Sequence, residues 1–146
     1  MLSKAIKNFT FKEFIDSNTA TNKGIDNIPE DFNVISNLLH TAFSMQQIRD
    51  ILNNPIRITS GYRCNKLNRI IGGSKTSQHC LGQAVDFICP KFGSLEKICE
   101  AIIESGVNFD QLIKEPGWVH ISFSQENNRR EIFNKSKAGL KKGLYS

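Results

Sequence analysis

A single carboxylate inside an apolar segment limits how this chain can fold. The segment Gln83–Ile88 alternates with a period of two, which would place Asp86 on one face of a strand and Val85 and Phe87 on the other. The neighbours of Asp86 on its own face are also apolar. A carboxylate in such a place is costly to bury unless a metal ion, an arginine or hydrogen bonds compensate it. The fold must therefore bring a partner to Asp86.

Two histidines are candidates for that partner. His79 lies seven positions before Asp86 in a polar loop, and His120 lies in a later strand-like segment, 118–123. Two imidazoles and one carboxylate are ligands of the type that holds a catalytic zinc ion with one position open. The residues alone leave a second interpretation open. In that interpretation His79 and Asp86 form a hydrogen-bonded structural pair, and His120 is an ordinary strand residue beside Trp118.

A zinc ion on these ligands would keep a positive charge and lower the pKa of a water molecule toward about 7. Such a site hydrolyses amides or esters if a carboxylate base lies beside it. Two carboxylates are close to His120 in the sequence: Glu115, at a turn predicted around Pro116-Gly117, and Asp110, at the start of the preceding strand. Glu115 is closer and longer in reach, although a turn glutamate is often simply solvated.

Arg63 is a further candidate for the site. It follows Ser60-Gly61-Tyr62 at the start of a predicted helix. A guanidinium there can bind a carboxylate through two hydrogen bonds. The same residue can also be a surface charge of the helix, and the sequence alone leaves both interpretations open.

The order of helical and strand-like patterns predicts an α+β fold with a small antiparallel sheet and helices packed on it. A capping box, Thr10 with Glu13, starts a short helix to about residue 17, and a polar connection, 18–27, follows. A long helix is expected from Pro29 to Leu52. Its apolar stripe at helical spacing is expected to consist of Phe32, Ile35, Leu39, Ala42, Ile48, Ile51 and Leu52. The later expected elements are strand 56–59, helix 63–71, strand 83–88, helix 94–105, strands 109–114 and 118–123, and a short strand at 131–133.

Length and charge restrict the class of protein. A chain of 146 residues suits one core, and nothing in it has the apolar length that spans a membrane. The first eight residues contain no apolar stretch long enough for a secretory signal, so we expect cytoplasmic synthesis. The net charge of +5 favours anionic partners in general. Because charge is the only argument for nucleic acid, we expect no nucleic-acid partner.

The basic residues are densest near the C-terminus, at Lys135, Lys137, Lys141 and Lys142. We therefore expect a domain over residues 1–134 and a flexible, solvated basic tail over 135–146. Such a tail could attach the protein to an anionic polymer.

The four cysteines form no Cys-x-x-Cys pair, which argues against a structural zinc ribbon. Without a secretory signal, reduced thiols are expected. Cys89 and Cys99 are in apolar contexts typical of a core, and Cys80, beside His79, is a rival candidate for a metal ligand.

The stretch Ser77-Gln78-His79-Cys80-Leu81-Gly82-Gln83-Ala84-Val85-Asp86 resembles the S-x-H-x-x-G-x-A-x-D signature of the zinc D,D-carboxypeptidase family of metallopeptidases. That family includes D-Ala-D-Ala carboxypeptidases, D-Ala-D-Ala dipeptidases and phage L-Ala-D-Glu endolysins. The resemblance covers roughly residues 9–134 and is strongest to a small single-domain branch. Further segments that carry it are Phe11–Phe14, Gly24–Asn27, Pro55–Arg63, Leu67-Asn68, Gly72–Ser74, Phe109–Ile113 and Trp118–Ser122.

The resemblance implies the fold that D,D-peptidases share with the hedgehog signalling domain. It implies that His79, Asp86 and His120 bind Zn²⁺, that Glu115 is the general base, that Arg63 holds the substrate or polarises its carbonyl, and that Ser77 supports the substrate. The substrate would be a peptidoglycan stem peptide cut at an amide bond, by a monomeric phage or bacterial lytic enzyme that acts at the cell wall after release or on the virion.

The sequence departs from several branches of the family at the base. In those branches the base lies three residues before the last histidine, where this chain has Gly117, whereas Glu115 lies five before it. Asp110 therefore remains an alternative base. Hedgehog domains keep the fold and a zinc site as binding proteins, so the fold also permits a non-catalytic wall-binding or virion module.

Overall fold

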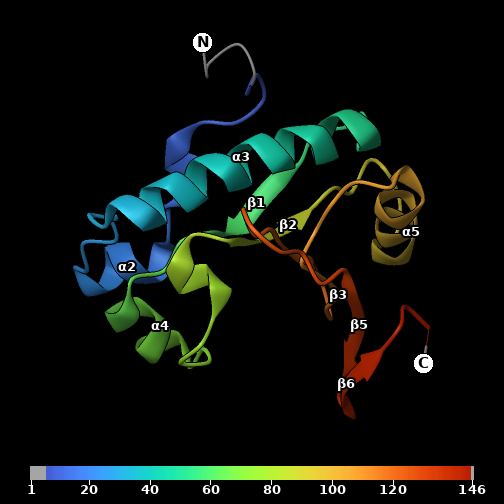
Figure 1. Ribbon diagram of the computed structural model, residues 1–146. Coiled ribbons are helices and arrows are strands. Elements are labelled where there is room, and N and C mark those ends of the chain that lie inside the picture. Colours follow the sequence, from blue (N-terminus) through green and yellow to red (C-terminus); the bar gives the residue numbers. More distant parts are fainter. Residues whose placement is uncertain (1–5, 146) are drawn as a thin grey trace.

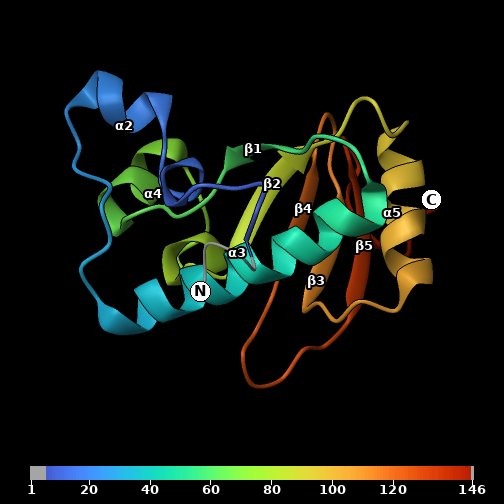
Figure 2. The ribbon, with the colours of Figure 1, turned by 90° about the horizontal axis from the view of Figure 1, so that it is seen from above.

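The long helix predicted by the sequence runs across one face of a six-stranded sheet in the computed structural model, which describes residues 6–145 (Figures 1 and 2). The predicted α+β class is confirmed. The elements in chain order are η1 (Phe11–Phe14), α2 (Asn18–Lys23), α3 (Phe32–Leu52), β1 (Arg57–Ser60), α4 (Asn65–Ile71), η2 (Gln78–Leu81), β2 (Ala84–Ile88), α5 (Leu95–Ser105), β3 (Gln111–Lys114), β4 (Val119–Ser122), β5 (Glu131–Ser136) and β6 (Gly139–Lys142).

The strands lie in the order β1-β2-β4-β3-β5-β6. Neighbouring strands are antiparallel except for β3 and β5, which pair in parallel. The sequence predicted an antiparallel sheet, so the β3–β5 pair is a difference. It arises because β4 ends and β5 begins at the same end of the sheet, since Gln111 of β3 pairs with both Ser122 and Glu131. β5 therefore runs opposite to β4 and parallel to β3, which lies between them.

The hydrophobic core lies between one face of the sheet and the helices α3 and α5. Val85 and Phe87 of β2 point into it, as the period-two pattern predicted. Two helices and two further strands contribute more fully buried side chains to this layer: Met45, Ile48 and Leu52 of α3, Ile98 and Ile102 of α5, Leu112 of β3, and Val119 and Ile121 of β4. Asp86 and His120 alternate with these residues and therefore point to the opposite face of the sheet.

The α3 helix differs from its prediction at its start. Asp31 caps it by accepting hydrogen bonds from the Asn33 and Val34 amides, so the helix begins after Pro29. The predicted stripe was wrong at its first residues, because Phe32 is 81% exposed and Leu39 is also exposed. The side chains that face the core recur at spacings of three and four from one residue earlier: Leu38, Ala42, Met45, Ile48 and Leu52.

A short helix, α2, occupies part of the segment predicted as a polar connection. The Ser17 hydroxyl accepts a hydrogen bond from the Ala20 amide at its start, and Gly24 ends it in a left-handed conformation with φ of 66°. Only Ala20 of this helix is buried, so its sequence carries no apolar periodicity that would have predicted it.

The predicted flexible tail is instead a β-hairpin on the sheet. β5 pairs with β3 through residues 131–134 and crosses the predicted domain boundary at residue 134, and β6 pairs with β5. Leu144 is buried after the hairpin. In Figure 1 the hairpin extends beyond the part of the sheet that α3 covers. Lys141 and Lys142 lie on the edge strand β6, where charge opposes pairing with another chain.

No helix within residues 6–145 combines the length and the apolar character needed to cross a membrane. The first five residues of the segment examined for a secretory signal lie outside the described residues.

Gly61 directly follows β1 and packs against Phe14 of η1. A Cβ atom at this position would lie 2.2 Å from the carbonyl oxygen of Phe14, and the neighbouring Tyr62 amide donates a 2.7 Å hydrogen bond to that oxygen. The close approach leaves no room for a side chain, and backbone atoms cannot move aside cheaply.

We predict that Gly61→Ala lowers the free energy of unfolding by about 1–3 kcal/mol, because the methyl group forces η1 away from β1. Urea unfolding of this variant, with Thr59→Ala on the exposed face of β1 as a control, measures the effect. Equal stability of the two variants would contradict this account of Gly61.

Candidate metal centre

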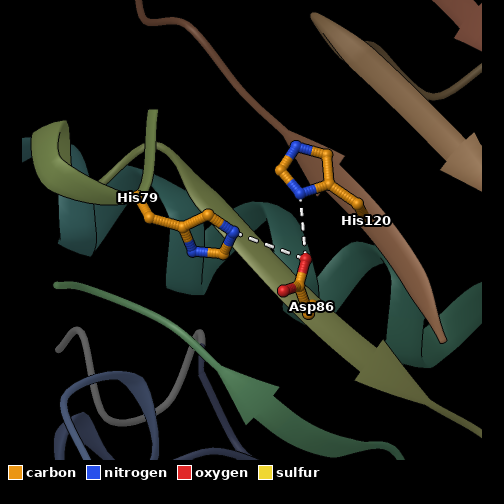
Figure 3. Close-up of side chains that lie close together, drawn as sticks. All are labelled: His79, Asp86 and His120. Atoms are coloured by element: carbon orange, nitrogen blue, oxygen red, sulfur yellow. Dashed lines mark hydrogen bonds and ion pairs between the residues drawn. The ribbon is translucent and has the colours of Figure 1, made fainter. Parts of the chain in front are cut away.

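Two neighbouring strands and a helical turn bring His79, Asp86 and His120 together (Figure 3). Asp86 lies directly opposite His120 in the antiparallel pair of β2 and β4, so both side chains project from the same face. His79 comes from η2, which immediately precedes β2. The Ser77 hydroxyl caps that turn by accepting a 3.2 Å hydrogen bond from the His79 amide. Gly82 ends it in a left-handed conformation and lets the chain enter β2.

The donor atoms are close enough for one ion. Each residue offers one atom, and these atoms lie within 4.8 Å of one another. Asp86 Oδ1 is 3.4 Å from His79 Nε2 and 2.9 Å from His120 Nδ1. Two ligand atoms on a tetrahedral zinc ion lie about 3.4 Å apart, since each is about 2.1 Å from the metal. Two nitrogens and one oxygen at these separations fit a divalent metal ion.

The contact that His79 Nδ1 makes with a backbone carbonyl leaves the other ring nitrogen, Nε2, facing Asp86. His79 Nδ1 is 2.8 Å from the carbonyl oxygen of Gly61, which can only accept a hydrogen bond. Nδ1 therefore carries the proton, and Nε2 presents a lone pair toward the Asp86 carboxylate. A lone pair facing a carboxylate oxygen is unfavourable, and a metal ion or a proton held between the two atoms would relieve the repulsion. The arrangement is also the common way in which a backbone carbonyl orients a metal-binding histidine.

Burial keeps His79 suited to metal binding. It lowers the pKa of His79, although the contact with Asp86 and its negative charge act in the opposite direction. Burial alone would raise the pKa of Asp86, but its interactions with His120 and His79 outweigh burial and hold that pKa below its ordinary value. A neutral imidazole and an ionised carboxylate are the protonation states in which these groups bind metal ions.

Glu115 lies at the turn between β3 and β4, where its amide donates a 3.0 Å hydrogen bond to the Trp118 carbonyl. Its side chain is only 12% exposed, and Oε2 lies 3.8 Å from the Nζ atom of Lys135 on β5. Burial raises the pKa of Glu115, and its neighbours Lys135 and His120 only partly oppose that effect.

Asp110 is held by hydrogen bonds at both carboxylate oxygens. Arg129 donates from its amide and Nε to Oδ1, at 2.9 and 3.0 Å, and from Nη2 to Oδ2, at 2.7 Å. Gln78 Nε2 donates to Oδ2 at 2.9 Å. The Arg129 hydrogen bonds lower the pKa of Asp110 to about 2. The pair fastens the segment before β5 to the start of β3.

Two depressions flank the three candidate ligands. One, of about 400 Å³, is lined by Asp86, Arg63 and Trp118 among others, and the second, of about 480 Å³, is lined by His120 and Ser77 among others. Arg63 Nη1 donates to Asn68 Oδ1 at 3.0 Å, whereas its Nε is buried without a hydrogen-bond partner among the described residues. Gly73 makes room for this pair, since a Cβ there would lie 2.1 Å from Asn68 Oδ1.

A protein-family model described as Peptidase M15 matches residues 7–122. The chain belongs to the peptidase M15 family. This confirms the resemblance to the zinc D,D-carboxypeptidase-type metallopeptidases and indicates a metal-dependent hydrolase of peptide bonds. A search of curated proteins found no match.

The structure of this M15 domain brings together the three residues that the sequence predicted as metal ligands and leaves out Cys80. Cys80 is not in the group of described side chains that can hold a metal ion. The sequence analysis missed Arg129 and Lys135, because both depend on the pairing of β5 with β3 across a long loop. It also missed Gln78, although this residue lies inside the signature itself.

We predict that His79→Ala and His120→Ala each abolish stoichiometric zinc binding, because each removes one of three protein ligands. His40→Ala is the matched control, since His40 lies on α3 and is not in the metal group. Elemental analysis after gel filtration measures the bound metal. Zinc should raise the melting temperature of the wild type and of the control only. Retention of zinc by the two ligand variants would contradict this metal site.

We predict that Asp110→Asn lowers the free energy of unfolding by about 1–3 kcal/mol at neutral pH, because it weakens a buried charged pair. The pKa of Asp110 is lower in the folded protein, so its stabilisation is present above the ordinary pKa of about 4 and is lost as pH falls through about 2. Urea unfolding across this range should show the two proteins converging in acid. A difference that is independent of pH would contradict the assignment; exposed Glu126→Gln is the control.

Proposed function

We propose that this protein is a zinc-dependent peptidase that hydrolyses an amide bond in peptidoglycan stem peptides. The observation that carries the proposal is the convergence of His79 Nε2 and His120 Nδ1 on Asp86 Oδ1, at 3.4 and 2.9 Å, with His79 Nδ1 held by the Gly61 carbonyl. A metal ion bound by these atoms would balance the charge of Asp86 and use the lone pair of His79 Nε2. Membership of the peptidase M15 family supports a peptidase rather than another metal-dependent hydrolase.

Zinc is the metal that this donor set suits best. Two imidazole nitrogens and one carboxylate are a recurrent set in catalytic zinc sites, whereas magnesium and calcium prefer oxygen ligands alone. When bound, zinc polarises the substrate carbonyl and lowers the pKa of water at the site. The protein residues then have to supply a base, a means of holding the substrate, and a path for the proton.

Glu115 is the residue that we assign as the base. Its half-buried position raises its pKa above the ordinary value, which makes the carboxylate a better acceptor of a proton from water, and the protonated form can return that proton to the leaving amine. Asp110 is a poor alternative, because Arg129 and Gln78 occupy both of its oxygens and hold its pKa at about 2. Such a carboxylate has little tendency to take up a proton.

Arg63 and Ser77 are the residues that we assign to substrate binding. Arg63 lines the depression beside Asp86 and has a buried N–H group, on Nε, without a partner in the described residues. A carbonyl or carboxylate oxygen of the substrate would satisfy it. The Ser77 hydroxyl already accepts a hydrogen bond from the His79 amide, so its own proton remains available for a substrate oxygen in the second depression.

The biological role that fits this activity is the lysis or remodelling of a cell wall, by a phage or bacterial enzyme. The substrate assignment follows from the family, whose members named above act on D-Ala-D-Ala or L-Ala-D-Glu bonds. A site of this kind serves either bond, since the residues that contact the flanking groups select between them.

We predict that Glu115→Gln keeps zinc binding and lowers turnover of muropeptides by about 10²–10⁴-fold, because the amide cannot accept a proton. Mass spectrometry of the digested muropeptides measures turnover and identifies the bond that is cut. Glu126→Gln, at an exposed carboxylate outside the site, is the control and should keep full activity.

Unchanged muropeptides with the zinc-loaded wild type would refute the peptidase proposal and leave a binding module of the same fold. Full activity of the Glu115 variant would refute only the assignment of the base.

A further inference from the structure

The depression on the His120 side of the metal centre has one permanently charged side chain in its described lining, that of Arg129. Its described lining consists of polar side chains, one isoleucine, the candidate ligand and one arginine: Ser74, Thr76, Ser77, Gln78, Gln111, Ile113, His120 and Arg129. No carboxylate belongs to that lining. Its volume of about 480 Å³ and its position beside His120 make it a place for the part of the substrate next to the cleaved bond.

Arg129 is fixed in this depression by one edge of its guanidinium. Nε and Nη2 donate to the two oxygens of Asp110, at 3.0 and 2.7 Å, and Asp110 is itself buried. Nη1 lies 3.3 Å from Glu131 Oε1. Arginine has five N–H donors, so two of them remain after these contacts, one on each Nη atom. The side chain is 51% exposed, and these donors are free to bind a ligand.

The neighbouring amide side chains of the same lining have fewer donors to offer. Gln78 Nε2 donates to Asp110 and Gln83, and Gln111 Nε2 donates to Glu131. Their amide groups are thus held in place, and the hydroxyls of Ser77 and Thr76 add donors at the rim. A held guanidinium beside such hydroxyls suits the two oxygens of a carboxylate.

We propose that Arg129 is a specificity-determining residue that binds a carboxylate of the substrate in this depression. The inference rests on the proposed function, since stem peptides carry free carboxylates on the glutamate, on the diamino acid and at the terminus. Arg63 acts in the depression beside Asp86, so the two arginines would hold the peptide on either side of the metal centre. Asp110 contributes by fixing the orientation of Arg129, and its rigid pairing reduces the entropy lost on binding.

The test is equilibrium binding of matched stem peptides to the metal-free protein, in which a carboxylate cannot be captured by the ion. Peptides that differ only by a free acid or a primary amide, at each of the three carboxylate positions, are titrated by calorimetry. The wild type should prefer the acid by about tenfold or more at one position, as expected for a hydrogen bond between charged groups. Arg129→Lys should reduce that preference severalfold, and Arg57→Lys on exposed β1 should leave it unchanged.

Glu131→Gln is a second variant that does not depend on the stability of Arg129→Lys. It removes the negative charge beside Nη1 and keeps the side chain's shape, so the preference for the acid should increase. Glu126→Gln is the control for a general change in charge. The ratio of acid to amide affinity is insensitive to any unfolded fraction, since unfolding weakens the binding of both peptides equally.

Equal affinity for acid and amide at all three positions, or a preference that Arg129→Lys leaves intact, would overturn the proposal. Neither result bears on the peptidase proposal, which turnover by the zinc-loaded enzyme tests separately. Conversely, a protein that prefers the acid through Arg129 but releases no amine would keep this inference and lose the catalytic one.

Discussion

The pairing of Asp86 with His120 across two antiparallel strands is the interaction on which the site depends. A carboxylate in an apolar strand is tolerated only if the fold places polar partners beside it. Here the register of β2 with β4 places His120 directly opposite Asp86. The same register sends Val85 and Phe87 into the core on the opposite face. A shift of one residue would therefore lose both the core and the site, so the stability of the sheet also secures the chemistry.

The third ligand depends on a different constraint. His79 comes from a helical turn whose ends are set by a serine cap and a left-handed glycine, and its ring is oriented by the carbonyl of Gly61 at the end of β1. Gly61 has no room for a side chain because it also contacts η1. A packing contact near the N-terminus thereby fixes the side-chain orientation of a ligand in the middle of the chain.

The sequence alone predicted the elements and candidate ligands whose patterns lie within one short segment. The α5 helix, from the Ser94 cap to Gly106, follows from residues within a single segment, and the metal triad follows from a compact signature and one strand histidine. The hairpin β5–β6 could not be predicted in the same way, because its main partner, β3, lies about twenty residues away and pairs with it in parallel. The choice between Glu115 and Asp110 required knowledge of Arg129, which only that pairing brings to Asp110.

The segment that matches the family model is shorter than the segment that forms the sheet, because the sheet also includes the β5–β6 hairpin. The family match ends at residue 122, at the end of β4, yet the strand next to β3 and the residues that contact Asp110 and Glu115 come afterwards. A chain cut at the end of the match would keep all three ligands and expose the full edge of β3. The residues that complete this domain therefore extend beyond the matched segment and include the β5–β6 hairpin.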